Sequence, residues 1–165
     1  MARQCFFSFH YKPDNWRVSQ VRNIGSIEGN KPARDNDWET VVGGGDQKIK
    51  DWIAEQMKGR SCTVILAGTN TANRKWINYE IVESWNKGMG VLVIYIHNLK
   101  DVNGNQSTKG NNPLSYITHG TTNKKLSEIA KAYDPPYSSS KSVYDYISEN
   151  IEDWIEDAIK IRKNN

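Results

Sequence analysis

Hydrophobic and polar positions alternate along the chain in blocks that predict strands and helices in turn. Three short runs are almost continuously apolar, at residues 5–10, 62–68 and 90–97. Runs of this length and composition are typical of strands that are buried on both faces of a sheet. We expect the first run to be the central strand, because it holds all 3 phenylalanines of the chain.

Three other stretches carry apolar residues at helical spacing. Asp46 is a suitable N-cap for a first helix, which Gly59 would end. A second helix is predicted over residues 75–87, and a third over residues 143–162. Strands that alternate with helices indicate an α/β fold with a mainly parallel sheet and helices on both faces.

Two long polar segments, at residues 11–46 and 98–125, show little periodicity. Their Gly, Asn, Ser and Pro residues favour loops, with at most one short strand or helix in the first segment. A short helix is predicted over residues 126–132, after the second segment.

Chain length, net charge and hydropathy indicate one domain and argue against some classes of partner. The chain has 165 residues, which predicts a single domain over residues 1–165. Its 22 basic and 19 acidic side chains give a net charge of +3 and are scattered, so a nucleic-acid partner is not expected. No run approaches the ~20 apolar residues of a membrane span, and the N-terminus lacks the features of a signal peptide. We therefore expect a cytoplasmic protein without a membrane partner.

Cysteine and histidine patterns argue against a metal site. Cys5 and Cys62 both lie in apolar runs and are expected to be free and buried. The three histidines show no metal-ligand spacing with each other or with a cysteine.

A candidate for chemistry lies on the second predicted helix. In open parallel sheets, ligands bind beyond the carboxyl ends of the strands, which here places Phe9, His10 and the turn after Ala67 near the site. Trp76 and Glu80 are four residues apart and so share one side of the helix, next to its buried face. From spacing alone, a packed Trp76 and a solvated Glu80 carboxylate are the more common arrangement.

Three segments resemble parts of TIR domains. Phe6–His10 is similar to their first strand. Cys62–Gly68 is similar to their third strand, and Trp76–Ile81 is similar to the helix that carries their catalytic glutamate. Within this family the chain most resembles the ThsB-type TIR-like proteins of the bacterial Thoeris antiphage system. The resemblance implies a TIR-like, flavodoxin-like α/β domain.

The resemblance also implies chemistry on NAD+, as a substrate rather than a resident cofactor. TIR enzymes of this kind break the bond between nicotinamide and ribose, with a glutamate at the position of Glu80. The departing nicotinamide leaves an oxocarbenium-like ribose, which a carboxylate stabilises. Trp76 matches an aromatic residue that lines the nucleotide site, and Phe9 and His10 match the lining of the nicotinamide-ribose pocket. Water attack would give ADP-ribose, and internal attack would give a cyclic ADP-ribose-type product, which is the preferred expectation.

Partners follow from the same resemblance. A Thoeris TIR protein is expected to respond to a phage-derived trigger and to activate the effector ThsA through a diffusible nucleotide signal. A homo-oligomer is also expected, because a neighbouring protomer often completes a TIR site.

The chain departs from the family in two places. Many TIR domains carry an arginine soon after the first strand; here that phosphate contact is unassigned, with Lys12 and Arg17 as candidate cations. The segment at residues 20–45 diverges so far that no functional residue is transferred to it.

Several other features have ordinary structural explanations. Gly43–Gly45 lacks the spacing of a phosphate-binding loop and is predicted to be a flexible loop. His97 is predicted to be a hydrogen-bonded structural histidine, and Glu83 is predicted to point to solvent.

Of the 6 tryptophans, three lie at apolar helix positions and are expected to pack there: Trp52, Trp85 and Trp154. Trp16 and Trp38 fall in loops whose role the pattern leaves open.

The sequence is compatible with two functions. The first is an NAD+-cleaving enzyme with Glu80 as its catalytic residue. The second is a non-catalytic TIR-like module that binds a nucleotide or a protein and signals by assembly, because a fold does not fix a function.

Overall fold

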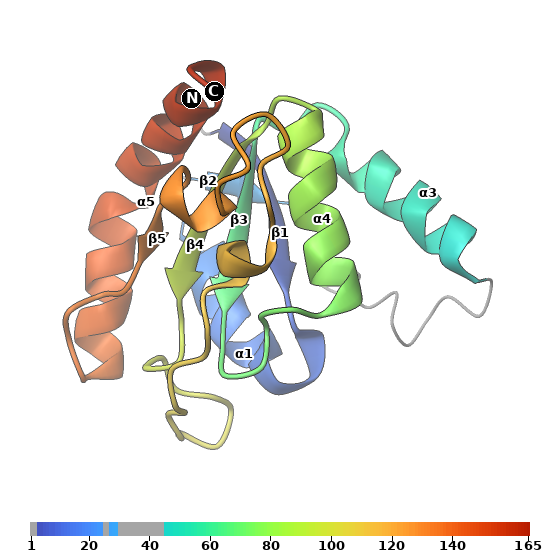
Figure 1. Cartoon of the computed structure of the whole chain (residues 1–165). Helices are drawn as coiled ribbons and strands as arrows, with labels where there is room; N and C mark the ends of the chain where they lie inside the picture. The colour runs from blue at the N-terminus through green and yellow to red at the C-terminus, as the bar shows by residue number, and fades with distance from the viewer. Residues whose placement is uncertain (1–2, 25–26, 30–44) are drawn as a thin grey trace.

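A computed structural model describes residues 3–24, 27–29 and 45–165, and it leaves the side chains of 27–29 undescribed. Its centre is a five-stranded sheet in which every neighbouring pair is parallel (Figure 1). The strands are β1 (Arg3–Phe9), β2 (Ile27–Gly29), β3 (Cys62–Ala67), β4 (Gly90–Tyr95) and β5 (Ala132–Tyr133). The α-helices are α1 (Tyr11–Arg22), α3 (Asp46–Met57), α4 (Lys75–Asn86) and α5 (Ser140–Lys163). Two 3-10 helices, η2 (Pro113–Tyr116) and η3 (Leu126–Glu128), follow β4.

The strand order is β2-β1-β3-β4-β5, which is the order of flavodoxin-like folds. The predicted α/β fold with a parallel sheet is therefore confirmed. The chain reverses its direction of travel across the sheet between β1 and β3, so the topological switch point lies there. The expectation that the phenylalanine-rich strand is central is wrong, because β3 occupies the middle and β1 lies beside it.

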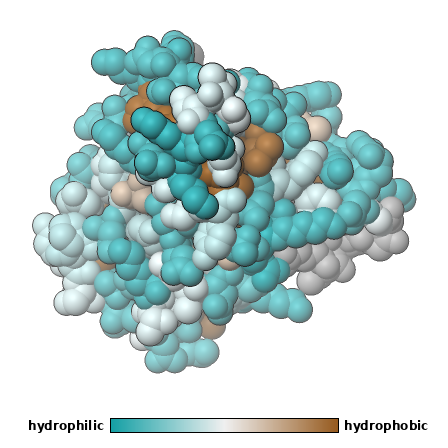
Figure 2. All heavy atoms as spheres, in the orientation of Figure 1, coloured by the Kyte–Doolittle hydropathy of each residue, from teal (hydrophilic) through white to brown (hydrophobic). Residues whose placement is uncertain are grey.

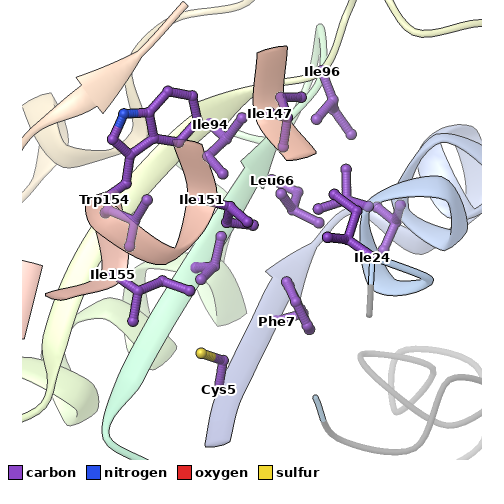
Figure 3. Packing of buried hydrophobic residues seen from close by; sticks show 14 of the residues in the cluster. Cys5, Phe7, Ile24, Leu66, Ile94, Ile96, Ile147, Ile151, Trp154 and Ile155 are labelled. Atoms are coloured by element: carbon purple, nitrogen blue, oxygen red, sulfur yellow. The ribbon is translucent and has the colours of Figure 1, made fainter. Parts of the chain in front are cut away.

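Side chains that alternate along each strand divide the core between the two faces. On one face, Cys5, Phe7 and Phe9 of β1 join a cluster with side chains of α1 and α5. Figure 3 shows Ile147, Ile151 and the neighbouring apolar side chains of α5 lying against the strands in this cluster. Burial of this apolar surface is the main source of stability for the sheet.

The opposite face of the sheet is covered in two parts. Ile77 and Ile81 of α4 pack over β3 and β4, together with Leu114 of η2 and Leu126 of η3. A smaller cluster joins Phe6 of β1 and Trp76 to Met89, which follows α4, and to three apolar side chains of α3: Ile49, Ile53 and Met57. The first half of α4 therefore lies between two apolar clusters, above the boundary of β1 and β3.

Residues 11–46, predicted as loops with at most one short strand or helix, contain the strand β2 and, over their first third, the helix α1. Its buried side chains are Asp14, Arg17, Val18 and Val21. Their spacing is helical, but two of the four are charged, so hydropathy alone does not show the period. Segment 30–44, including Trp38 and Gly43–Gly44, lies outside the described residues.

The other predicted helices are confirmed except the one over 126–132, where only Leu126–Glu128 forms a 3-10 helix. The first turn of α3 begins at Asp46, and Gly45 occupies the N-cap position, so the prediction of Asp46 as N-cap is off by one residue. The helix predicted over 126–132 is the short η3, and the strand β5 follows it. The helix predicted over 143–162 is confirmed as α5, with Ser139 as its N-cap.

Apolar side chains cover little of the face of the molecule that Figure 2 draws. Figure 2 shows a mostly hydrophilic face, with hydrophobic atoms in small separate patches. In the part of the chain that the structure describes, no helix combines the length and the apolar character needed to cross a membrane.

Candidate active site

The candidate site is built on the first half of α4. The buried residues of α4 include Trp76, Glu80 and Ser84, which recur every four positions along one side of the helix. This side faces β1, β3 and α3 rather than solvent. The sequence-based expectation that Trp76 and Glu80 share one side of the helix at its buried face is confirmed.

Glu80 lies entirely inside the protein, with an exposed fraction of 0%. The hydroxyl of Ser8, also 0% exposed, donates a hydrogen bond of 2.6 Å to Oε1 of Glu80. Ser8 belongs to β1 and pairs in register with Ile65 of β3, so this contact lies at the switch point of the sheet. A solvated Glu80 carboxylate, the ordinary alternative for this spacing, is therefore excluded.

A second buried hydroxyl pair holds the backbone of the same residue. The Ser84 hydroxyl donates to the carbonyl oxygen of Glu80 at 2.6 Å, and it lies 2.6 Å from Oγ1 of Thr63. Since the Ser84 proton goes to the carbonyl, Thr63 is the donor to Ser84. Glu80 is thus fastened through its side chain to β1 and through its backbone to β3.

Trp76 packs in the interior next to Glu80. Its exposed fraction is 8%, and it belongs to the cluster formed by Phe6 and α3. The Tyr79 ring meets it edge-on at 5.4 Å between centroids, and Nζ of Lys75 lies 4.9 Å from the centre of its ring. The expectation that Trp76 packs is confirmed, whereas a role in stacking on a nucleotide stays a prediction.

The two residues predicted from the end of the first strand lie in different places. Phe9 is 3% exposed and points into the cluster of α1 and α5, on the face of the sheet opposite to Glu80. His10 is partly exposed and occupies the N-cap position of α1, at the carboxyl edge of the sheet. The structure therefore brings Trp76 and Glu80 together, places His10 at the edge of the sheet, and separates the Phe9 ring from them.

Loops after β3 and β4 close the carboxyl edge. The Gly68 backbone passes so close to the Asp14 carboxylate that a Cβ at Gly68 would overlap it. The Thr71 hydroxyl accepts a hydrogen bond of 2.9 Å from the Gly68 amide, and the Thr69 hydroxyl donates to the Thr108 carbonyl at 2.6 Å. These contacts fix the turn that leads from β3 into α4, and so the starting position of the helix that bears Glu80.

Arg17 is not available as the cation that the family pattern requires. It is 4% exposed, pairs with Asp14 at 3.2 Å, and donates to the carbonyl of Leu99 at 2.8 Å. Burial raises the pKa of Asp14, and the positive charge of Arg17 opposes that rise. Arg17 thus serves to hold the loop after β4, and Lys12, which is exposed, is the other cation that the sequence offers.

His97 follows β4 and is 8% exposed. It meets the Tyr95 ring edge-on at 6.3 Å, and burial lowers its pKa. Its Nδ1 has no hydrogen-bond partner among the described residues, so the prediction of a hydrogen-bonded structural histidine is confirmed in burial but not in bonding.

Cysteines and metal-binding groups contribute nothing further to the site. Cys5 and Cys62 are free and buried, as predicted, and burial raises the pKa of the Cys62 thiol well above its ordinary value. Among residues 3–24, 27–29 and 45–165, no three His, Cys, Asp or Glu side chains are grouped so that they could hold a metal ion.

A cavity of about 310 Å³ lies at the other end of α4. Trp85, His119 and Arg162 are among its lining residues. Trp85 follows Trp76 by nine residues, which is ~14 Å along a helix axis. Because Trp76 and Glu80 do not line this cavity, it is separate from the candidate site.

Sequence reasoning did not single out Ser8. The available signal was a lone polar residue within the apolar run Cys5–Phe9. A hydroxyl buried in a parallel strand needs a hydrogen-bond partner, which here is the carboxylate of Glu80.

Comparison with known proteins fits this geometry. Residues 6–101, more than half of the chain, match the family described as Thoeris protein ThsB, TIR-like domain. A relative from Bacillus cereus (strain MSX-D12), named "Putative cyclic ADP-D-ribose synthase ThsB1", is 37% identical over 122 residues. The aligned region covers 71% of this chain and 64% of the relative, so the chain spans just under two thirds of the relative's length. The chain belongs to the TIR-like family of ThsB proteins from the Thoeris system.

Proposed function

We propose that the protein cleaves NAD+ between nicotinamide and ribose and forms a cyclic ADP-ribose-type signal. The observation that carries the proposal is the buried carboxylate of Glu80, held at the β1/β3 switch point by Ser8. The name of the Bacillus cereus relative describes the same class of product. NAD+ is the substrate, and no resident cofactor is needed for this step.

The chemistry follows from what a held carboxylate does. The glycosidic bond breaks, its electron pair leaves with nicotinamide, and positive charge develops on the ribose. A carboxylate in a low-dielectric site stabilises that charge more than it would in water. A hydroxyl or ring nitrogen of the same molecule then bonds to the ribose carbon and closes the cycle, while water in its place would give linear ADP-ribose.

Access to Glu80 requires movement. Because Glu80 is 0% exposed and Trp76 is 8% exposed, NAD+ reaches the carboxylate only after part of its cover is displaced. This burial fits an enzyme that is inactive until a phage-derived trigger or a neighbouring copy opens the site. Trp76 then supports the nucleotide and His10 lies at the rim, whereas Phe9 supports the end of β1 from the opposite face. In the cytoplasm, the product would reach the effector ThsA by diffusion.

One observation favours a non-catalytic module instead. Glu80 has no exposed surface and accepts a short hydrogen bond from Ser8. In a non-catalytic module, the role of this contact is structural: it fastens α4 to the sheet. In that case the protein would signal by assembly, and no nicotinamide would be released.

The test compares Glu80→Gln with Glu83→Gln. Glutamine keeps the size of glutamate and the oxygen that accepts from Ser8, so the fold should survive. Glu83 lies on the same helix, is partly exposed, and serves as the matched control. Protein from resting and infected cells is incubated with NAD+, and nicotinamide and ribosyl products are separated by chromatography.

We expect Glu80→Gln to lower turnover by about 100- to 1000-fold, in the range measured for loss of one charge-stabilising group. Glu83→Gln should stay within about twofold of the unaltered chain. Equal turnover in Glu80→Gln and the unaltered chain would refute the role of Glu80. Assembly in infected cells without release of nicotinamide would establish the non-catalytic module.

A further inference from the structure

We infer that Ser8 is a positioning residue for Glu80, setting the orientation of its carboxylate for the reaction proposed above. This inference rests on the proposed function and adds a residue to it. Ser8 does not touch the substrate and forms no covalent bond. It donates one hydrogen bond to Oε1 of Glu80.

The contact has the features of a strong hydrogen bond. Its 2.6 Å length falls in the range of hydroxyl donors on ionised carboxylates, which are about twice as strong as neutral pairs. Both partners are 0% exposed, so water does not compete for either of them. Ser8 is also the one polar side chain in the buried stretch Cys5–Phe9, whose other members all pack in apolar clusters.

The backbone of Glu80 is held by other groups, and Ser8 contacts its carboxylate directly. The Ser84 hydroxyl bonds the Glu80 carbonyl, and Thr63 on β3 bonds Ser84. With the helix held on β3, the contact to β1 selects one rotamer of Glu80. A carboxylate set in advance stabilises a developing charge without reorganising during the reaction.

This geometry predicts a specific kinetic defect. Without the Ser8 hydroxyl, the carboxylate loses one of the contacts that orient it toward the ribose, while the groups that bind the rest of NAD+ stay in place. The loss should therefore fall on kcat and leave KM nearly unchanged. A purely structural role would lower the amount of folded protein and leave kcat per folded molecule unaltered.

The experiment uses the full chain with Ser8→Ala, Ser8→Cys and the control Ser139→Ala. Ser139 caps α5 by accepting from the Ser142 amide at 3.1 Å, so its loss removes a serine hydrogen bond far along the sequence from α4. Cysteine is close to serine in size and is a weaker donor, so it covers the case in which Ser8→Ala folds poorly. Initial rates over a range of NAD+ concentrations give kcat and KM, and thermal unfolding gives the folded fraction.

We expect kcat to fall by about 10- to 100-fold in Ser8→Ala, the scale of a small misplacement of a reacting group, with KM within about twofold. Ser8→Cys should be intermediate, and Ser139→Ala should keep the kcat of the unaltered chain. In the Glu80→Gln background, Ser8→Ala should have no further effect on the rate.

Other outcomes distinguish a failure of the positioning role of Ser8 from a failure of the proposed function. Turnover that depends on Glu80 but is equal in Ser8→Ala and the unaltered chain would overturn the positioning role and leave the proposed function standing. A rise in KM with unchanged kcat would also overturn it. No consumption of NAD+ by the unaltered chain from infected cells would overturn the proposed function, and the role of Ser8 with it.

Discussion

The two faces of the sheet are built from the same strands but carry different kinds of side chain. Toward α1 and α5, the buried residues of β1 and β3 are all apolar: Cys5, Phe7, Phe9, Cys62, Val64 and Leu66. Toward α3 and α4, the same strands present Ser8 and Thr63 among their apolar residues. Alternation along a strand thus lets one face provide stability while the other holds a carboxylate.

The face toward α3 and α4, here called the polar face, tolerates buried hydroxyls among its apolar side chains because these hydroxyls are paired. A hydroxyl buried without a partner would cost about 1–3 kcal/mol. Ser8 gives its proton to Glu80, and Thr63 and Ser84 form a chain to the Glu80 carbonyl. Glu80 therefore has its own hydrogen-bond support, separate from the apolar core.

The largest expected effect comes from a cavity in the apolar face. Ile151 of α5 is 0% exposed and lies among the strands in Figure 3. We expect Ile151→Ala to lower the free energy of unfolding by about 2–5 kcal/mol, because it removes buried methyl groups and leaves a void. Urea unfolding measures this loss, and kcat for NAD+ per folded molecule should stay unchanged.

A second variant of the same helix provides the control. Ile159 is only partly buried, so Ile159→Ala should cost clearly less stability than Ile151→Ala. If Ile151→Ala instead lowered kcat and left the free energy of unfolding unaltered, this would contradict the assignment of a stabilising role to the face toward α1 and α5.

The sequence predicted the α/β fold because apolar runs and helical spacing follow directly from burial. The same logic located the helix with Trp76 and Glu80, since its stripe of apolar residues is regular. It missed α1, whose buried side includes the ion pair of Asp14 and Arg17 at 3.2 Å. A pattern of hydropathy cannot distinguish charges that are buried and paired from charges in solvent.

The candidate site was predictable in part for a related reason. Neighbours along a helix follow from spacing, so the pair of Trp76 and Glu80 could be found from the sequence. The contact between Ser8 and Glu80 joins residues 72 positions apart, and it depends on how α4 crosses β1. The same holds for Phe9, whose face of the strand is fixed by register rather than by its closeness to His10 in sequence.

A smaller effect is expected from the hydroxyl pair on the polar face. Thr63→Val keeps the shape of the side chain and removes the donor to Ser84, while the bond from Ser84 to the Glu80 carbonyl remains. We expect a loss of about 0.5–1.5 kcal/mol in the free energy of unfolding, measured by urea denaturation. Thr121→Val, at an exposed position, should change stability less.

Thr63→Val also tests which of the two contacts to Glu80 matters more for the reaction. Because Thr63 acts on the backbone of Glu80 and Ser8 acts on its carboxylate, kcat should fall less in Thr63→Val than in Ser8→Ala. The reverse order would mean that the position of α4, rather than the orientation of the carboxylate, limits the reaction.

The smallest effect is the pH dependence of stability that comes from His97, which follows β4 at the carboxyl edge of the sheet. Burial lowers the pKa of His97 below its ordinary value of 6.5, with Lys109 and Arg17 acting in the same direction and Asp134 opposing them. The unfolded chain therefore binds a proton at a higher pH than the folded chain does. The stability that neutral His97 contributes is complete above about pH 6.5 and is lost as the pH falls through the folded pKa.

His97→Gln removes this dependence. Urea unfolding at pH 7.5 and pH 5 should show the unaltered chain losing more stability on acidification than the variant, by a modest margin because one partly shielded group is involved. Ile151→Ala changes no titratable group, so it should show the same pH dependence as the unaltered chain. A smaller loss of stability on acidification in His97→Gln assigns the acid-sensitive group to His97, after β4. An equal loss in the variant and the unaltered chain would place that group elsewhere.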